Sequence, residues 1–212
     1  MKKLMIVCLV LCSLSGIAQS NIPIDRENFF RFGAKAGVNL NKISGQSFNS
    51  GFNFNYQVGA FAQFNFSQRF GLQPEVNFVQ MSSEFANEPS DVYYDLFLDG
   101  SQKTATLNYL EIPLLLNINV GLSKHVKIQI GPSYGALLSS TVENLKTNGT
   151  DSLNFKNGDW SAIGGLWIQL PLVNFGARYK IGLSDVNNSA LNATNPDTWR
   201  NEAIQVFVGV TF

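Results

Sequence analysis

Seven charged residues stand out because each lies in a stretch where apolar and polar residues alternate. They are Arg31, Lys35, Glu75, Glu111, Lys127, Arg178 and Lys180. In each stretch the charge falls on the polar side of the alternation, opposite an apolar side that carries no charge. Because an unpaired buried charge costs several kcal/mol, we predict a network in which Glu75 and Glu111 bridge Lys35, Arg178 and Lys180. A static network would plug the interior, whereas a mobile one would gate an ion path.

Nucleophilic or metal chemistry has little support in the residues. The only histidine, His125, lies beside a predicted turn, and both cysteines, Cys8 and Cys12, fall in an amino-terminal leader. Aspartates in one predicted loop could offer carboxylate oxygens to calcium, but their spacing does not form a compact binding loop. These are Asp91, Asp95 and Asp99. We therefore expect no enzyme activity, no cofactor and no metal.

Alternation at period two recurs eight times and predicts eight strands. The clearest stretch is 52–66, where Phe54, Tyr56, Val58 and Phe64 alternate with Asn55, Gln57 and Gln63. The other stretches are 30 to about 41, 70 to about 82, 104–120, 125 to about 140, 160–170, 173–184 and 203–212. The connections alternate in length, with long ones at about 42–51, 83–103, 141–159 and 185–200. An even strand number with this alternation predicts an all-β fold, an eight-stranded antiparallel transmembrane up-and-down β-barrel.

The apolar side of these strands should face lipid. A soluble barrel would turn that side inward, but then the charges would lie outside and the aromatics inside. Phenylalanines gather near the short turns, as in an interfacial girdle, and glycines recur on the polar side. They are Phe30, Phe66, Phe70, Phe175 and Phe212, and Gly33, Gly37, Gly59, Gly131, Gly165, Gly176 and Gly209. Small residues must lie beside long ones there, because eight strands enclose only enough space for side chains.

The amino terminus predicts export. Basic Lys2 and Lys3 precede a short apolar run, and small residues end at Ala18. Residues 1–18 are therefore predicted to be a cleaved signal peptide, 19–29 a periplasmic lead-in and 30–212 the barrel, in the cell outer membrane of a Gram-negative bacterium. The 212 residues carry a formal net charge of zero and no basic run, so we expect no nucleic acid partner.

Several strands resemble the Bacteroidetes outer-membrane β-barrel family often called PorT-like. The resemblance rests on 32–40 (FGAKAGVNL), 72–75 (LQPE), 108–116 (NYLEIPLLL), 131–132 (GP) and 176–179 (GARY). It implies an outer-membrane barrel and accounts for Pro74 and Pro113 as family features. One family member gives its name to gliding and type IX secretion machinery. The terminal Phe212 resembles the signal that the barrel-assembly machinery recognises.

We predict a monomer that is embedded in outer-membrane lipid, with a side-chain-filled lumen and a structural or accessory role in a surface or secretion assembly. The alternatives are adhesin-like binding of a ligand or surface through the long loops, and a small gated pore. Aromatic residues in the loops could contact a protein or a sugar, or could equally cover the barrel mouth. They are Tyr93, Tyr94, Phe97 and Trp199.

Overall fold

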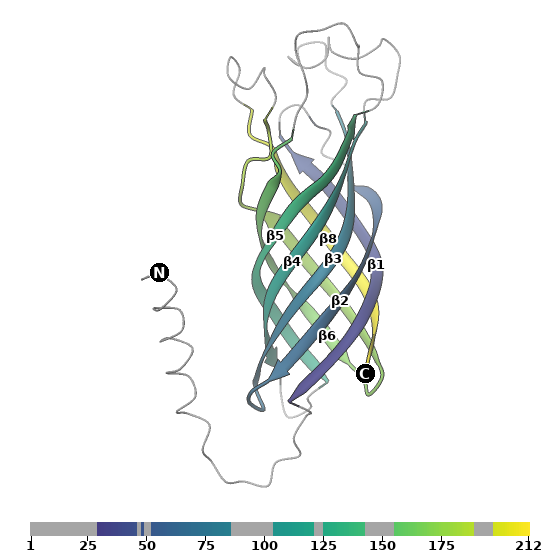
Figure 1. Cartoon of the computed structure of the whole chain (residues 1–212), viewed down its shortest axis with the longest axis vertical. Coiled ribbons are helices and arrows are strands. Elements are labelled where there is room, and N and C mark those ends of the chain that lie inside the picture. Colours follow the sequence, from purple (N-terminus) through teal and green to yellow (C-terminus); the bar gives the residue numbers. More distant parts are fainter. Residues whose placement is uncertain are drawn as a thin grey trace, which may run out of the picture.

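Eight antiparallel strands form a closed barrel in the computed structural model (Figure 1). The strands are β1 (Phe30–Ser44), β2 (Asn53–Asn65), β3 (Phe70–Glu84), β4 (Thr104–Asn119), β5 (Val126–Val142), β6 (Gly158–Gln169), β7 (Val173–Gly182) and β8 (Arg200–Thr211). The structure describes residues 29–45, 48, 52–85, 104–120, 125–142, 155–188 and 197–212. The predicted fold class is confirmed. Among the described residues there is no helix that could cross a membrane.

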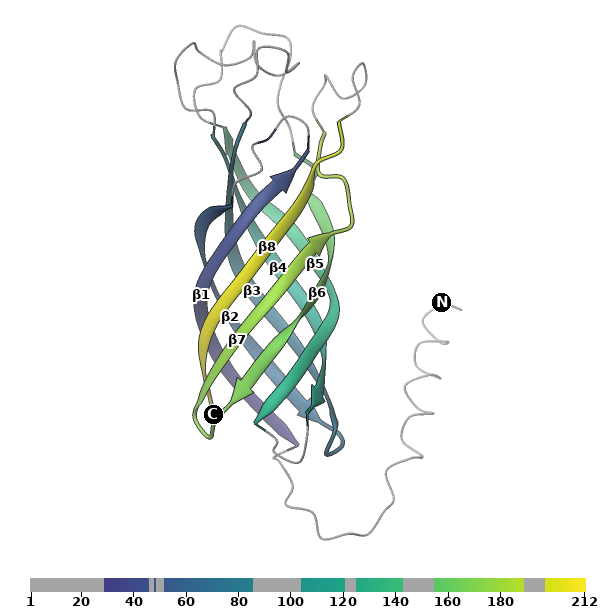
Figure 2. The same cartoon turned by 180° about the vertical axis from the view of Figure 1, so that it is seen from behind.

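The first and last strands close the barrel, so neither is left with a free edge. Their pairing runs from Gly33 opposite Thr211 to Ser44 opposite Arg200. Figure 2 shows β8 lying between β1 and β7. The carboxyl terminus lies at the same end as the start of β1, and we call this the lower end of the barrel (Figure 1).

The outward face is apolar along most of each strand, and on β1, β3, β4 and β8 it becomes polar toward the upper end. On β1 it changes between Leu40 and Lys42, and on the paired β8 between Ile204 and Glu202. On β3 the outward face changes between Phe78 and Gln80. On the paired β4 it changes between Leu110 and Asn108. Below this level each strand offers about ten residues, enough to cross a lipid core about 25 Å thick. The outward apolar side chains thus form one belt.

The upper parts of several strands run farther than the sequence alternation predicted. β1 continues to Ser44, β3 to Glu84 and β5 to Val142, while β8 begins at Arg200. These extensions lie above the belt, where backbone pairing continues the sheet and inward residues such as Ile43 and Met81 are buried. A register shift between Asn108 and Tyr109 accommodates one additional residue of β5 there.

Aromatic side chains gather at the lower end of the belt on the side formed by β7, β8 and β1–β3, as a membrane interface favours. Phe30 lies 5.2 Å from Phe64 between ring centroids, and Phe32 lies 5.7 Å from Phe212. The backbone N–H of Phe212 also donates to the carbonyl oxygen of Phe32 at 2.8 Å. Phe212 is therefore an outward-facing member of this aromatic group at the seam between β1 and β8.

A charge introduced at mid-belt tests the assignment of the outward face. Val208 lies on β8 midway between Ile204 and Phe212, faces outward, and pairs with Ala36 and Phe175. We expect Val208→Arg to lower the free energy of unfolding in lipid by about 2–4 kcal/mol, because the guanidinium would enter the hydrocarbon. Gln80→Arg, which is outward but above the belt, should cost about 0–1 kcal/mol. Denaturant titration in vesicles measures both, and equal effects would contradict the placement of the belt.

Candidate functional site: a charged and capped lumen

Glu75 on β3 binds two buried cations in the lower half of the lumen. Its Oε2 accepts from Lys35 Nζ at 2.6 Å and from Arg178 Nη1 at 2.9 Å, and its Oε1 accepts from Arg178 Nη2 at 2.7 Å. The arginine contact is bidentate, which fixes both planar groups. All three side chains have no solvent-exposed area. We call Lys35, Glu75 and Arg178 the Glu75 group.

Neighbouring amides complete the hydrogen bonding of the Glu75 group. Gln73 Nε2 donates to Glu75 Oε1 at 2.7 Å, and Asn77 Nδ2 donates to Oε2 at 3.1 Å. Gln129 Oε1 accepts from Arg178 Nε at 2.9 Å and Nη2 at 2.6 Å. With each carboxylate oxygen accepting at least two bonds, the group has the order expected of a static plug.

Three aromatic rings fill the space beside these charges. Trp167 lies 5.1 Å from Phe61 and 5.6 Å from Phe207 between centroids. The Phe207 ring also lies 4.4 Å from Lys35 Nζ and 4.5 Å from Arg178 Cζ, in a cation–π arrangement. Glycines make this packing possible, because a Cβ at Gly33 would strike the Phe61 ring and one at Gly176 would strike the Phe207 ring. Small inward residues therefore lie beside long ones.

A second charge group lies higher in the lumen. Lys180 on β7 forms an ion pair with Glu111 on β4, and its Nζ lies 3.8 Å from Asp159 Oδ2. Asn201 Nδ2 donates to the same Asp159 oxygen at 2.9 Å and to the Tyr109 hydroxyl at 3.3 Å. We call Glu111, Asp159 and Lys180 the Glu111 group. Residue 159 was predicted to lie in a loop, but it belongs to β6 and its carboxylate faces inward. The only signal in the sequence was its position next to the predicted strand at 160–170.

Below the Glu75 group, amide side chains join neighbouring strands. Gln63 Nε2 donates to Gln73 Oε1 at 2.7 Å, and Asn117 Nδ2 donates to the same oxygen at 2.8 Å. Gln129 Nε2 donates to Asn117 Oδ1 at 2.7 Å. Nearer the lower rim, Asn174 Nδ2 donates to the hydroxyl of Thr211. Polar side chains thus cross-link the lumen from the rim up to the ion pairs.

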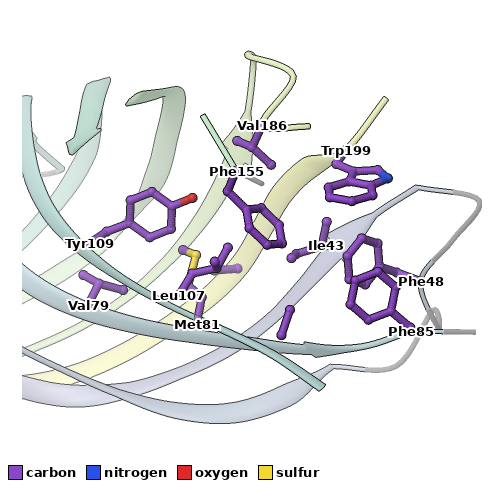
Figure 3. Close-up of a cluster of buried hydrophobic side chains, with 12 residues drawn as sticks. Ile43, Phe48, Val79, Met81, Phe85, Leu107, Tyr109, Phe155, Val186 and Trp199 are labelled. Atoms are coloured by element: carbon purple, nitrogen blue, oxygen red, sulfur yellow. The ribbon is translucent and has the colours of Figure 1, made fainter. Parts of the chain in front are cut away.

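Apolar side chains fill the upper end of the barrel (Figure 3). Phe48 lies 4.3 Å from Phe85 and 5.1 Å from Trp199 between ring centroids, and Phe155 lies 5.3 Å from Trp199. The whole cluster, which we call the apolar cap, comprises Ile43, Phe48, Val79, Met81, Phe85, Ala105, Leu107, Tyr109, Phe155, Val186, Trp199 and Ala203. The cap closes the mouth with buried side chains.

The apolar cap reverses the polarity of the sheet. Inward Met81 and Leu107 are fully buried, while their outward neighbours Gln80 and Asn108 are polar. Lower on the same strands, Glu75 and Glu111 face inward and Phe78 and Leu110 face outward. Above the belt, β3 and β4 are therefore arranged as in a soluble barrel, with their apolar side inside. The alternation of residue types along the chain did not predict this reversal.

A family model described as "Outer membrane protein beta-barrel domain" matches residues 17–188. The chain belongs to this family. The two charge groups, the amide side chains below the Glu75 group and the lower part of the apolar cap are thus the interior of an outer-membrane barrel.

Solved structures of outer-membrane barrels resemble this family member. Neisserial surface protein A (NspA) aligns with a TM-score of 0.50 and 16% identity, over 87% of this chain and 98% of its own. OprG from Pseudomonas aeruginosa aligns with a TM-score of 0.45 and 13% identity, over 86% and 95%. Ail of Yersinia pestis aligns with a TM-score of 0.47 and 9% identity, over 86% and 99%. The likeness to NspA shows the fold alone. No curated protein matches the chain significantly.

The seven charged residues occupy different levels of this outer-membrane barrel. Five of them form the Glu75 group and, with Asp159, the Glu111 group. Lys127 is fully buried on β5. Arg31 lies at the lower rim, where its Nη2 donates to the carbonyl oxygen of Pro171 at 3.1 Å. Arg31 therefore belongs to the rim between β1 and the β6–β7 turn, below both charge groups.

The other predicted residues divide between the cap, the surface and the undescribed part of the chain. Trp199 is fully buried, and its Nε1 donates to Asp197 Oδ2 at 2.9 Å. Trp199 therefore helps to cover the barrel mouth and is not exposed to a partner or a sugar. His125 lies exposed just before β5. Outside the described residues lie Tyr93, Tyr94, Phe97, Asp91, Asp95 and Asp99. Within the described ranges, no three His, Cys, Asp or Glu gather in a way that could hold a metal ion.

Proposed function

We propose that this protein is a non-conducting outer-membrane barrel with a structural or accessory role in a surface or secretion assembly. The observation that carries the proposal is the filled lumen, in which the apolar cap lies over two buried charge groups. A channel needs a continuous hydrated path that ions can enter and leave. A barrel filled in this way instead offers a rigid support for the long connections at its upper end.

Planar-bilayer recording tests the closed lumen. We expect the purified protein to give no ion current, and Glu111→Ala to be equally silent, because the Glu75 group and the apolar cap would still fill the barrel. Heat-modifiable gel mobility identifies the folded fraction of each preparation. Current from folded Glu111→Ala, with a silent parent, would instead favour the small gated pore and would contradict the proposal.

A pull-down from cross-linked outer membranes tests the accessory role. The proposal expects proteins of a secretion, gliding or other surface complex to co-purify with the tagged chain. The resemblance to PorT-like proteins motivates this expectation. A matched control replaces the segment 86–103, between β3 and β4, with a short Gly/Ser linker, which keeps the barrel but removes one upper connection. Binding of a glycan or host surface, without a co-purifying complex, would favour the adhesin-like alternative.

The proposal includes a route to the membrane. A signal peptide over residues 1–18 would deliver the chain to the periplasm, and the barrel-assembly machinery would recognise Phe212 during insertion. Phe212 is exposed next to Phe32 at the lower end of the seam between β1 and β8, which suits a residue that another protein must contact. The resident partner would then be lipid around a monomeric barrel, with no nucleic acid.

A further inference from the structure

Between the Glu75 group and the apolar cap, each of the eight strands directs one polar side chain inward. We call this set the middle ring: Asn39, Gln57, Asn77, Glu111, Ser133, Ser161, Lys180 and Gln205. Register places Asn39 opposite Gln205, Asn77 opposite Glu111, and Ser133 opposite Ser161. Every member is at most 2% exposed. The middle ring is therefore a continuous polar layer enclosed by the barrel wall.

Seven members of the middle ring carry buried polar atoms without a partner among the described residues. For Gln57 both amide atoms, Oε1 and Nε2, are unpartnered, and for Ser133 and Ser161 the hydroxyl oxygens are. The remaining unpartnered atoms are Asn39 Oδ1, Asn77 Oδ1, Glu111 Oε2 and Gln205 Nε2. Ser133 and Ser161 are register partners, yet their hydroxyls form no hydrogen bond with each other. Since buried polar groups in native proteins are almost always hydrogen-bonded, the layer requires a ligand.

The middle ring is enclosed from both sides. The next inward residue below Asn77 is Glu75, and below Gln205 it is Phe207, so the Glu75 group and its aromatic rings form the floor. The next inward residue above Asn77 is Val79, and above Gln205 it is Ala203, both in the apolar cap. Above Asn39, Gln57 and Ser161 the next inward residues are polar but buried, namely Asn41, Asn55 and Asp159. Buried side chains therefore separate this layer from both aqueous sides.

The unpartnered atoms identify the ligand. They include carbonyl and carboxylate oxygens that only accept, amide Nε2 groups that only donate, and hydroxyls that do both. A metal cation would satisfy the oxygens and leave the amide donors of Gln57 and Gln205 unpaired. Water both donates and accepts, and a buried water typically makes two to four hydrogen bonds to groups of this kind. We propose that the middle ring binds a cluster of water molecules, in a hydrated chamber occluded at both ends.

Gln129 provides a matched control for Gln57, because neither of its amide atoms is left without a partner. Both are buried, inward-facing glutamines, but Gln129 Nε2 donates directly to Asn117 Oδ1 at 2.7 Å and its Oε1 accepts from Arg178 Nε at 2.9 Å. Water-selective NMR of the refolded protein should give cross-peaks from water to the side-chain amide protons of Gln57 and none to those of Gln129. Such a difference supports the chamber. Absence of the Gln57 cross-peaks, with its protons assigned and visible, overturns it.

Paired substitutions test the chamber without structure determination. Gln57→Met keeps the length of the side chain while removing both unpartnered atoms, so a dry layer should gain stability from it. If water bonds the amide, the folding equilibrium constant should stay unchanged or fall. Gln129→Met removes an amide that is bonded directly to protein groups, and it should lower the constant at least about tenfold. Denaturant titration in vesicles measures both. A rise in the folding equilibrium constant for Gln57→Met overturns the chamber, whatever the bilayer recordings and the pull-down give.

Discussion

Glu75→Leu is expected to lower the free energy of unfolding by about 3–5 kcal/mol, since it leaves two buried cations without their shared carboxylate. Lys35 and Arg178 would then face each other across the lumen with no solvent to screen them. The Phe207 ring contacts both cations but offers only a partial substitute for an anion. Guanidinium titration of the protein in vesicles, followed by tryptophan fluorescence, measures the loss.

Glu202→Gln is the matched control for Glu75→Leu. Glu202 faces outward on β8 and pairs with Lys42 at 3.4 Å, with both side chains 23% exposed. Partly exposed pairs of this kind contribute about 0–1 kcal/mol. A comparable loss in both variants would mean that the Glu75 group is not specially buried. A Glu75→Leu protein as stable as the parent would contradict the ion-pair geometry.

Trp199→Ala is expected to cost about 3–5 kcal/mol, the range for removing a large buried aromatic side chain. Its indole contacts three other rings of the apolar cap, those of Phe48, Phe85 and Phe155. Those rings hold the ends of β1, β3 and the segment before β6 together over the mouth (Figure 3). The substitution should therefore lower stability and increase proteolysis at the upper end. Urea titration and limited trypsin digestion of vesicle-inserted protein measure these two effects.

Trp160→Ala serves as the comparison, because Trp160 is an outward tryptophan that is 55% exposed and contacts the Tyr134 ring at 5.1 Å. Trp160→Ala should lower the free energy of unfolding less than Trp199→Ala does, and it should leave the digestion pattern of the upper end unchanged. If the two variants behaved alike, the indole of Trp199 would not be part of a packed cap.

The barrel could be predicted from the sequence because the alternation of apolar and polar residues is a local property of each strand. Period-two alternation in 52–66 requires a strand, and a charge such as Glu75 opposite Pro74 and Val76 can face only away from lipid. Strand register then brings Lys35 and Arg178 to Glu75. The same local rule hid the cap. Met81 and Leu107 are apolar and alternate with polar neighbours as the lipid-facing residues below do, so the pattern gives no sign that inside and outside have exchanged.

Other parts of the site depend on contacts between distant segments. Phe48 and Phe155 lie outside any alternating stretch, and each is placed by a single bridge, to Phe85 and to Asn187 respectively. Asp159 faces inward because it lies within β6, which begins at Gly158, two residues before the strand that was predicted from residue 160. No pattern of residue types along the chain encodes these long-range contacts, so the sequence could not predict them.

The change of outward polarity has a consequence for how deep the barrel sits. If the molecule rose by two residues, Phe78, Leu110 and Leu40 would meet water, and if it sank, Gln80, Asn108 and Lys42 would enter hydrocarbon. Both displacements are unfavourable on several strands at once, because the change occurs at matched registers on the paired strands β1 and β8 and on the paired strands β3 and β4. The barrel wall itself therefore fixes how deeply the protein sits in the bilayer, and with it the height of the upper strand ends above the lipid.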